Sequence, residues 1–394
     1  MSHVILAQGG EAKHLLVVGA TGSGKSTLIN ELLHGAFRRA DRAIIVDPNG
    51  HALERFGTSG DLVLNPFDTR SPGWSIFNEL RKSYDYERLA KSLIPDSDEP
   101  TAQQWHGYAQ QLAAETMRAL SRNGDMTTER LLFWLTQAPN EDLKTLLAGS
   151  PMVGLFNEGA DKALGSTKFI ITTYISCHQY LRPGDFSLRN WLEAEKGNLF
   201  ITWHEGMVDS LRPLVSAWAD ILIATILTSR TVNPQRLWLV LDELASLNQL
   251  NSLEAGLTKG RKHGLQIVAG VQAMSQLDSR YGIHNARSLR SCFSNLVALG
   301  GSTSDPHTAR ELSDGLGQFE VERTVTTISE SDGKRSTSTT RQRSVEQALL
   351  PSELTGLQPL EGFLKFAGNA PIAKFTLVHR EYPINTAAFS EFNT

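Results

Sequence analysis

The glycine-rich stretch from Gly19 to Ser26 constrains the fold of this chain more than any other feature. It reads Gly-Ala-Thr-Gly-Ser-Gly-Lys-Ser. An apolar run from His14 leads into it, and a helix is expected to open at Lys25, which is the context of a phosphate-binding loop. Glycines allow the backbone N–H groups to turn inward around phosphate oxygens, and the helix adds the positive end of its dipole. A glycine-rich turn that binds nothing is the alternative, which the flanking strand and helix disfavour.

This loop predicts the residues that contact a nucleoside triphosphate. Lys25 is expected to reach the β- and γ-phosphates, and Ser26 is expected to hold Mg²⁺. The sequence therefore predicts ATP and Mg²⁺ as ligands. The predicted nucleotide-binding residues are Gly19, Ala20, Thr21, Gly22, Ser23, Gly24, Lys25, Ser26 and Thr27.

Apolar runs with strand character recur along the chain, and several are apolar for five or six residues. Strands that are buried on both faces have this composition. Helical stretches lie between many of the runs, so we predict an α/β fold with a mainly parallel central sheet and helices on both sides. The predicted strands are His14–Gly19, Ala43–Asp47, Asp61–Asn65, Asn198–Trp203, Arg236–Asp242, Leu265–Gln272, Asn295–Gly300, Phe363–Ala367 and Ala373–Val378.

The alternation of strands and helices stops after Asn65. Between about Tyr84 and Tyr180, apolar residues recur at helical spacing and prolines punctuate the segment. This pattern predicts an inserted all-α domain over residues 79–185. The nucleotide-binding domain would then consist of residues 1–78 and 186–394.

Two adjacent acids, Asp242 and Glu243, follow the apolar run Trp238–Leu241. At the carboxyl end of a central strand, Asp242 would coordinate Mg²⁺ through its water shell, and Glu243 would polarise the attacking water as a general base. An acidic N-cap for a helix predicted over Leu244–Lys259 is the alternative.

Two further polar residues are candidates for catalysis. Gln272 ends the next buried strand, where its amide can sense the γ-phosphate or orient the water; a strand-end glutamine bonded to backbone is the alternative. Arg261 lies where a helix ends and can enter a neighbouring subunit's site to neutralise phosphoryl charge. It can equally be a favourable cation at a helix C-terminus. The segments Asp47–Gly50 and Asn65–Asp68 read as turns after strands, and contact with the site is the alternative for each.

The charge and the apolar content limit other functions. The formal net charge is −4, so any contact with nucleic acid must be local. Arg287, Arg290, Arg341 and Arg343 are candidates for such contacts. The two cysteines have no neighbours at metal-ligand spacing. The most apolar helical stretch, Ala217–Leu227, is too short to span a bilayer, and the chain as given is expected to be soluble.

Residues 324–344 are rich in Ser, Thr and charged residues. They can form a disordered linker. They can also form a long β-hairpin with Asp332 and Gly333 at its turn, because Val325, Thr327 and Ser329 alternate before it. We predict the hairpin.

Several blocks, taken in order along the chain, resemble the type IV coupling proteins of conjugation systems, which are TrwB/TraD-like. The phosphate motifs alone would specify only a superfamily, whereas the turn and helix-end blocks sharpen the resemblance, which runs through nearly the whole chain. The blocks are Gly19–Ser26, Ile45–Gly50, Leu64–Asp68, Asn78, Leu199–Trp203, Leu241–Ser246, Thr258–Lys262, Ala269–Gln272 and Phe366–Pro371.

The resemblance implies a RecA-like P-loop ATPase related to FtsK that forms a homo-hexameric ring. Such proteins link the relaxase-bound DNA to a secretion channel and pump single-stranded DNA, largely without sequence preference, through a central pore. It also implies the ATPase roles of Lys25, Asp242, Glu243 and Gln272, and an arginine-finger role for Arg261. Family members sit at the cytoplasmic face of the bacterial inner membrane through a segment that this sequence lacks.

Two other functions remain open. The chain can be a substrate-docking receptor in which ATP binding mainly controls ring assembly. It can also be an unrelated DNA translocase of the FtsK/HerA type.

Overall fold

A nine-stranded sheet forms the centre of the computed structural model, which describes residues 13–228, 235–302, 304–331, 334–368 and 370–392. The strand order is β11-β10-β7-β1-β6-β5-β2-β4-β3. The seven strands from β7 to β3 in this order are parallel, and β10 and β11 add antiparallel at one edge. The predicted mainly parallel sheet is confirmed, as are its strands: β1 (Leu15–Val18), β2 (Arg42–Pro48), β3 (Leu62–Leu64), β4 (Leu199–Trp203), β5 (Leu237–Leu241), β6 (Leu265–Val271), β7 (Asn295–Leu299), β10 (Glu361–Lys365) and β11 (Ala373–Thr376).

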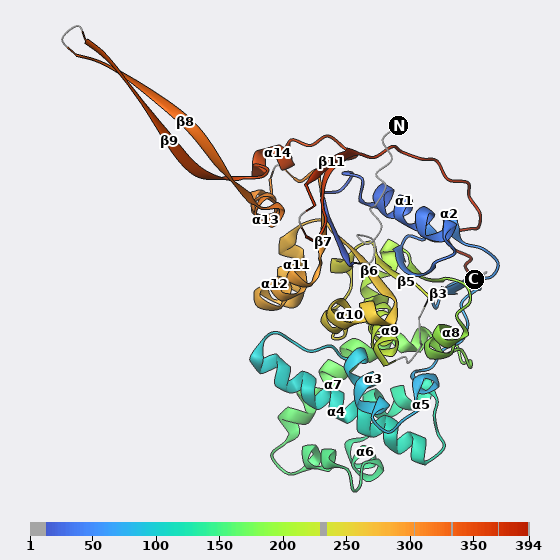
Figure 1. Ribbon diagram of the computed structural model, residues 1–394. Helices are drawn as coiled ribbons and strands as arrows, with labels where there is room; N and C mark the ends of the chain where they lie inside the picture. Colours follow the sequence, from blue (N-terminus) through green and yellow to red (C-terminus); the bar gives the residue numbers. More distant parts are fainter. Residues whose placement is uncertain (1–12, 229–234, 303, 332–333, 369, 393–394) are drawn as a thin grey trace.

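Both faces of the sheet are covered, which explains the long apolar runs. In β1, Leu15 and Val17 belong to one apolar cluster, and Leu16 and Val18 belong to another. The first cluster includes side chains of α1 (Lys25–Arg38) and α2 (His51–Phe56), which lie together over the sheet in Figure 1. The remaining helices around the sheet are α8 (Leu188–Ala194), α9 (Val208–Thr228), α10 (Leu253–Lys259), α11 (Met274–Tyr281), α12 (Ile283–Cys292), α13 (Pro306–Leu316) and α14 (Pro351–Thr355).

Helix α9 is the central helix of the second cluster. It runs for 21 residues, so the expectation that this apolar stretch is too short to span a bilayer does not hold for the whole helix. Together with the turn before it, Glu205–Thr228, it is long and apolar enough to cross a membrane. However, 78% of the apolar window is buried inside the protein. Its apolar composition is therefore that of a core helix.

A helical body lies on one side of the sheet, in the lower half of Figure 1. Its helices share one continuous apolar cluster with α9 and one face of the sheet. The chain enters the helical body near Glu79 and leaves it near Leu188. The buried Glu79 links these two segments, since it accepts hydrogen bonds from Trp74 Nε1 at 2.9 Å and from the backbone N–H of Leu188 at 2.7 Å. The boundaries of the predicted insertion, 79–185, stay a prediction. The helices are α3 (Asp85–Leu93), α4 (Pro100–Arg122), α5 (Thr128–Leu132), α6 (Asn140–Leu146) and α7 (Asp161–Ile175).

The single helix predicted over Leu244–Lys259 is wrong. A short 3₁₀ turn over Leu244–Ser246 is followed by an extended segment, and α10 begins only at Leu253. The connecting segment is held by side chains of α9, because Asp220 accepts a hydrogen bond from the backbone N–H of Ser252 at 2.6 Å. These tertiary contacts outweigh the local helical pattern.

Two long paired strands occupy the segment 324–344, where we predicted a hairpin, and extend beyond it on both sides. Strands β8 (Gln318–Ser331) and β9 (Lys334–Gln347) pair antiparallel and project away from the body in Figure 1. The predicted turn at Asp332 and Gly333 lies outside the described residues. So does Asn369, within the tail block Phe366–Pro371.

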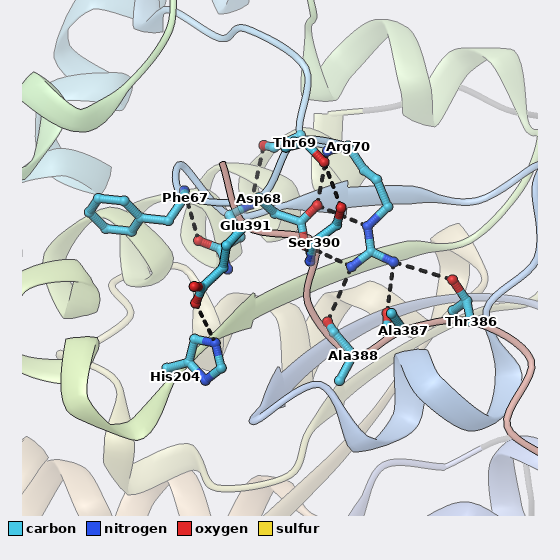
Figure 2. A network of polar contacts seen from close by, with 12 residues as sticks. Phe67, Asp68, Thr69, Arg70, His204, Thr386, Ala387, Ala388, Ser390 and Glu391 are labelled. Carbon is cyan, nitrogen blue, oxygen red and sulfur yellow. Dashed lines mark hydrogen bonds and ion pairs between the residues drawn. The ribbon is translucent and has the colours of Figure 1, made fainter. Parts of the chain in front are cut away.

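The C-terminal segment returns across the domain after β11. Arg70 pairs with Asp68 at 2.6 Å and donates hydrogen bonds to the carbonyl oxygens of Ala387 at 2.7 Å and Ala388 at 3.2 Å (Figure 2). Ser390 donates its backbone N–H to Asp68 at 3.0 Å. The turn after β3 therefore anchors the end of the chain.

Candidate nucleotide-binding site

The carboxyl ends of the central strands meet at one edge of the sheet. Strand β6 lies between β1 and β5, so the polar residues that follow these three strands are neighbours. They open onto a pocket of about 550 Å³. Its lining residues are Ala20, Thr21, Gly22, Gly24, Lys25, Ser26, Thr27, Pro48, Asn49, His51, Trp203, Glu205, Val208, Asp242, Glu243, Ser246, Gln272 and Leu360.

The glycine loop is built for close backbone approach. Gly22 and Gly24 have φ angles of 79° and 111°, in the region that side chains disfavour. Helix α1 begins directly after Gly24, so its free N–H groups face the loop. Lys25 Nζ donates to the carbonyl oxygen of Gly19 at 2.8 Å. The loop thus presents one ammonium and a set of backbone N–H groups to an anion.

Gly19 and Ser23 support the loop rather than line the pocket. A Cβ on Gly19 would lie 2.4 Å from Ser23 Oγ and 2.7 Å from Leu299 Cβ. Ser23 is buried, and the backbone N–H of Leu360 donates to its carbonyl oxygen at 3.0 Å. These two predicted contact residues therefore shape the loop from behind.

Two oxygen ligands suited to Mg²⁺ lie next to each other in the lining of the pocket. Ser26 Oγ is 3.4 Å from Asp242 Oδ2, and the hydroxyl donates to the carboxylate. In the described part of the chain, no group of three or more His, Cys, Asp or Glu side chains is placed to hold a metal. A hard cation here would take a hydroxyl, a carboxylate, waters and phosphate oxygens as ligands, which is the set that Mg²⁺ prefers. The residues fit that ion.

A chain of side-chain hydrogen bonds joins β6 to the acid and to the loop. Gln272 Nε2 donates to Glu243 Oε2 at 2.9 Å, and Gln272 Oε1 accepts from Thr21 Oγ1 at 3.0 Å. Glu243 Oε1 is buried and has no hydrogen-bond partner among the described residues. Neither carboxylate caps the turn at 244–246: that turn has no side-chain cap, and Asp242 instead accepts from Ser26. The geometry leaves one carboxylate oxygen available for a donor such as water.

Burial changes the proton affinity of each charged group. It lowers the pKa of Lys25, against the opposing charges of Glu243 and Asp242. It raises the pKa values of Asp242 and Glu243, although Lys25 and hydrogen bonds from Ser26 and Gln272 act in the other direction. A raised carboxylate pKa suits a residue that must accept a proton.

A third carboxylate lies beside Asp242, in the turn segment Asp47–Gly50. Strand β2 pairs with β5 through Val46 and Leu241, which places Asp47 next to Asp242. Burial raises the pKa of Asp47 to about 7, and the charge of Asp242 adds to the shift. Pro48 and Asn49 line the pocket, so this segment is part of the site as well as a turn.

The second turn segment serves a different purpose. Asn65–Asp68 is not among the lining residues of the pocket and instead anchors the C-terminal segment (Figure 2). His204 Nε2, next to the lining residue Trp203, lies 3.0 Å from Glu391 Oε1 (Figure 2). The C-terminal segment thus contacts the residue that follows β4.

Arg261 lies at the other edge of the sheet. It belongs to the 3₁₀ turn Gly260–His263 that precedes the amino end of β6, and its charge acts on His14 at the amino end of β1. The structure therefore does not bring Arg261 to the pocket of its own chain.

Several lining residues were not among the predicted site residues. Trp203 ends β4, Glu205 and Val208 follow that strand, and Leu360 comes from the segment before β10. The strand-end position of Trp203 is a signal that sequence reasoning could have used. Nothing in the sequence marks Leu360.

A family model for the type IV secretion-system coupling protein DNA-binding domain matches residues 1–378. The chain belongs to this family of coupling proteins. The coupling protein TraD of Escherichia coli (strain K12) is 30% identical over 292 residues, which cover 71% of this chain and 40% of TraD. VirD4 of Bartonella quintana (strain Toulouse) is 29% identical over 183 residues, which cover 44% of this chain and 28% of VirD4. The chain therefore spans less than half the length of these relatives.

Solved structures of another coupling protein resemble nearly the whole chain. The unbound monoclinic form of TrwBdeltaN70 is 43% identical with a TM-score of 0.90, and the match covers 98% of this chain and 89% of that one. TrwB in complex with ADP and Mg²⁺ is 44% identical with a TM-score of 0.90, covering 97% and 89%. The expected RecA-like fold with a helical body is thus the fold of this coupling-protein family.

Proposed function

We propose that this chain hydrolyses ATP and uses the energy to move DNA into a type IV secretion channel. The observation that carries the proposal is the placement of Glu243 and Gln272 against Thr21 of the glycine loop, opposite Ser26 and Asp242. A protein that only binds nucleotide has no need of a general base at this position. The ADP and Mg²⁺ in the TrwB complex support both ligands.

The residues of the pocket have different roles in this mechanism. Backbone N–H groups of the loop and Lys25 hold the β- and γ-phosphates and neutralise the charge that develops during transfer. Ser26 and Asp242 would hold Mg²⁺, which when bound screens the phosphate charges. Glu243 accepts a proton from the attacking water, while Gln272 keeps that carboxylate oriented and links it to the loop.

Arg261 acts in a neighbouring subunit's site in this proposal. Arg261 lies too far from the pocket of its own chain to reach a phosphoryl group there. Its guanidinium therefore meets a phosphoryl group through a contact between neighbouring subunits of a ring. A homo-hexameric ring supplies one such contact per site, and its central pore accommodates single-stranded DNA without sequence preference.

The cellular setting follows from the family. Because the chain belongs to the coupling proteins, we propose that it links a relaxase–DNA complex to the channel proteins at the cytoplasmic face of the bacterial inner membrane.

ATP hydrolysis with and without single-stranded DNA tests the proposal, with oligomer size measured in parallel. The wild type should hydrolyse ATP, and the addition of single-stranded DNA at low salt concentration should raise the rate severalfold. Glu243→Gln should keep nucleotide binding but lose about 10²- to 10⁴-fold in rate. Equal rates for wild type and Glu243→Gln would refute the assigned base.

A second measurement separates a motor from a docking receptor. Lys25→Ala removes the ammonium that reaches the phosphates, so DNA transfer should stop. If recruitment of relaxase persists while transfer stops, docking and motor roles coexist in one protein. Transfer that survives in Lys25→Ala would refute the motor.

A further inference from the structure

A second polar cleft lies beside the nucleotide pocket. It has a volume of about 530 Å³ and shares Glu243, Ser246 and Gln272 with that pocket. The rest of its lining comes from Ala245 and from one face of α11: Ser275, Gln276, Ser279 and Arg280. Glu243 and Gln272 therefore separate two cavities. Nucleotide binding accounts for only one of them.

The cleft contains one arginine, Arg280, and one carboxylate, Glu243, which form no ion pair with each other in the described structure. Arg280 is half-buried, and its hydrogen bond in the described structure goes to the carbonyl oxygen of Ala245 at 3.3 Å. No ion pair with a carboxylate is found for it among the described residues. Burial and the nearby charge of Arg212 lower the pKa of Arg280. An anion in the cleft would stabilise the charged guanidinium against both its burial and the repulsion from Arg212.

The neutral residues of the cleft suit one class of anion. Two hydroxyls and an amide stand beside the guanidinium on α11. Contacts to the nucleic-acid backbone are made by this mixture of arginine, serine and glutamine side chains. We propose that the cleft binds phosphodiester groups of the DNA strand; this inference rests on the proposed function and names where the DNA contacts the motor.

Two hydrogen bonds connect the cleft to the catalytic residues. Arg280 holds the carbonyl of Ala245, two residues after Glu243. Gln276 Oε1 accepts from the backbone N–H of Gln272 at 3.1 Å, and Gln272 in turn donates to Glu243. A phosphodiester that accepts from Arg280 competes with the carbonyl oxygen of Ala245 for the guanidinium, whereas Gln276 can donate Nε2 to it and still accept from Gln272. DNA bound in the cleft therefore acts on Glu243 through the backbone at Ala245.

Three of the four arginines that we predicted for DNA contact form ion pairs, while Arg287 is exposed on α12, and all four stay predictions. Arg290 pairs with Asp278 at 2.8 Å and contacts Glu311 at 3.4 Å. Arg341 and Arg343 each lie 3.7 Å from a glutamate on the opposite strand of the hairpin. Arg280 was missed because its lack of a partner depends on tertiary packing.

The test compares Arg280→Gln with Arg280→Lys and with Arg310→Gln, a control that removes an exposed arginine from α13. The readouts are the ratio of DNA-stimulated to unstimulated ATP hydrolysis, the salt dependence of DNA binding and the oligomer size. In Arg280→Gln the ratio should fall from severalfold to near one. The slope of log affinity against log salt should shrink by roughly 0.7 for one lost single-strand phosphate contact.

The controls decide between explanations. Arg280→Lys should retain the salt slope, since it keeps the charge, and Arg310→Gln should retain the stimulation ratio. Wild-type stimulation in Arg280→Gln would overturn this inference while leaving the proposed function intact. A wild type that DNA does not stimulate would refute the proposed function and this inference together. Lost stimulation accompanied by lost oligomers would overturn the DNA assignment in favour of an acidic group of a second copy.

Discussion

Replacing Asp47 by Asn should change how the stability of the protein depends on pH. The folded protein holds the Asp47 proton up to a pKa of about 7, whereas the ordinary value is 3.8. Between these values the folded state binds more protons than the unfolded state, so stability falls as the pH rises. From the two pKa values, Asp47 lowers the free energy of unfolding by about 1.7 kcal/mol at pH 5 and about 4.3 kcal/mol at pH 8.

Asn keeps an oxygen that can accept the hydrogen bond that Asp47 receives from Leu53 N at 2.9 Å, but it does not ionise. The difference in stability between Asp47→Asn and wild type should therefore grow by about 2 to 3 kcal/mol from pH 5 to pH 8. Urea unfolding followed by tryptophan fluorescence at both pH values measures it. Any constant cost of the amide cancels in this comparison.

The exposed Asp142→Asn in α6 is a matched control and should follow the wild type at both pH values. The reasoning fails if Asp47→Asn and wild type differ by the same free energy at pH 5 and pH 8. That result would mean that Asp47 is ionised in the fold, with a cation or a hydrogen-bond network compensating for its burial.

Three other substitutions test the framework around the site. Glu79→Ala leaves buried donors such as Trp74 Nε1 unsatisfied, at about 1–3 kcal/mol each, so the urea midpoint should fall markedly. Gly270→Ala would place a Cβ 2.1 Å from the carbonyl oxygen of Asp242; ATP hydrolysis should drop, and a wild-type rate would contradict the close packing of β5 on β6. Arg70→Ala removes the clamp on the C-terminal segment, so limited proteolysis should cut there faster than in wild type.

The sheet was predictable because its burial is symmetrical. Strands such as β5 are covered on both faces, so their sequences are unbroken apolar runs. Such runs can be recognised without knowing which strands lie next to them. The glycine loop was predictable for a related reason. Its requirements are local, namely backbone freedom at Gly22 and Gly24 and a helix that starts at Lys25.

What sequence reasoning missed depends on strand order and packing. Asp47 reads as a turn residue until β2 is placed next to β5, where it becomes a third carboxylate at the site. Leu360 enters the pocket because its N–H bonds to Ser23, more than three hundred residues earlier. The helix predicted after Glu243 failed because the buried Asp220 holds the following segment in another path.

Arg261 shows why the single chain is an incomplete site under the proposed mechanism. Strand β6 runs for seven residues between the turn that carries Arg261 and the edge that carries Gln272. At about 3.3 Å per residue, that strand spans roughly 20 Å, which exceeds the reach of an arginine side chain. A parallel sheet places all its amino ends on one edge and all its carboxyl ends on the other. An arginine at the amino edge can therefore meet a triphosphate only across a head-to-tail contact, in which the amino edge of one copy faces the carboxyl edge of the next. Such contacts close into a ring when the rotation between copies allows it, so the proposed mechanism makes catalysis depend on assembly through the position of one residue.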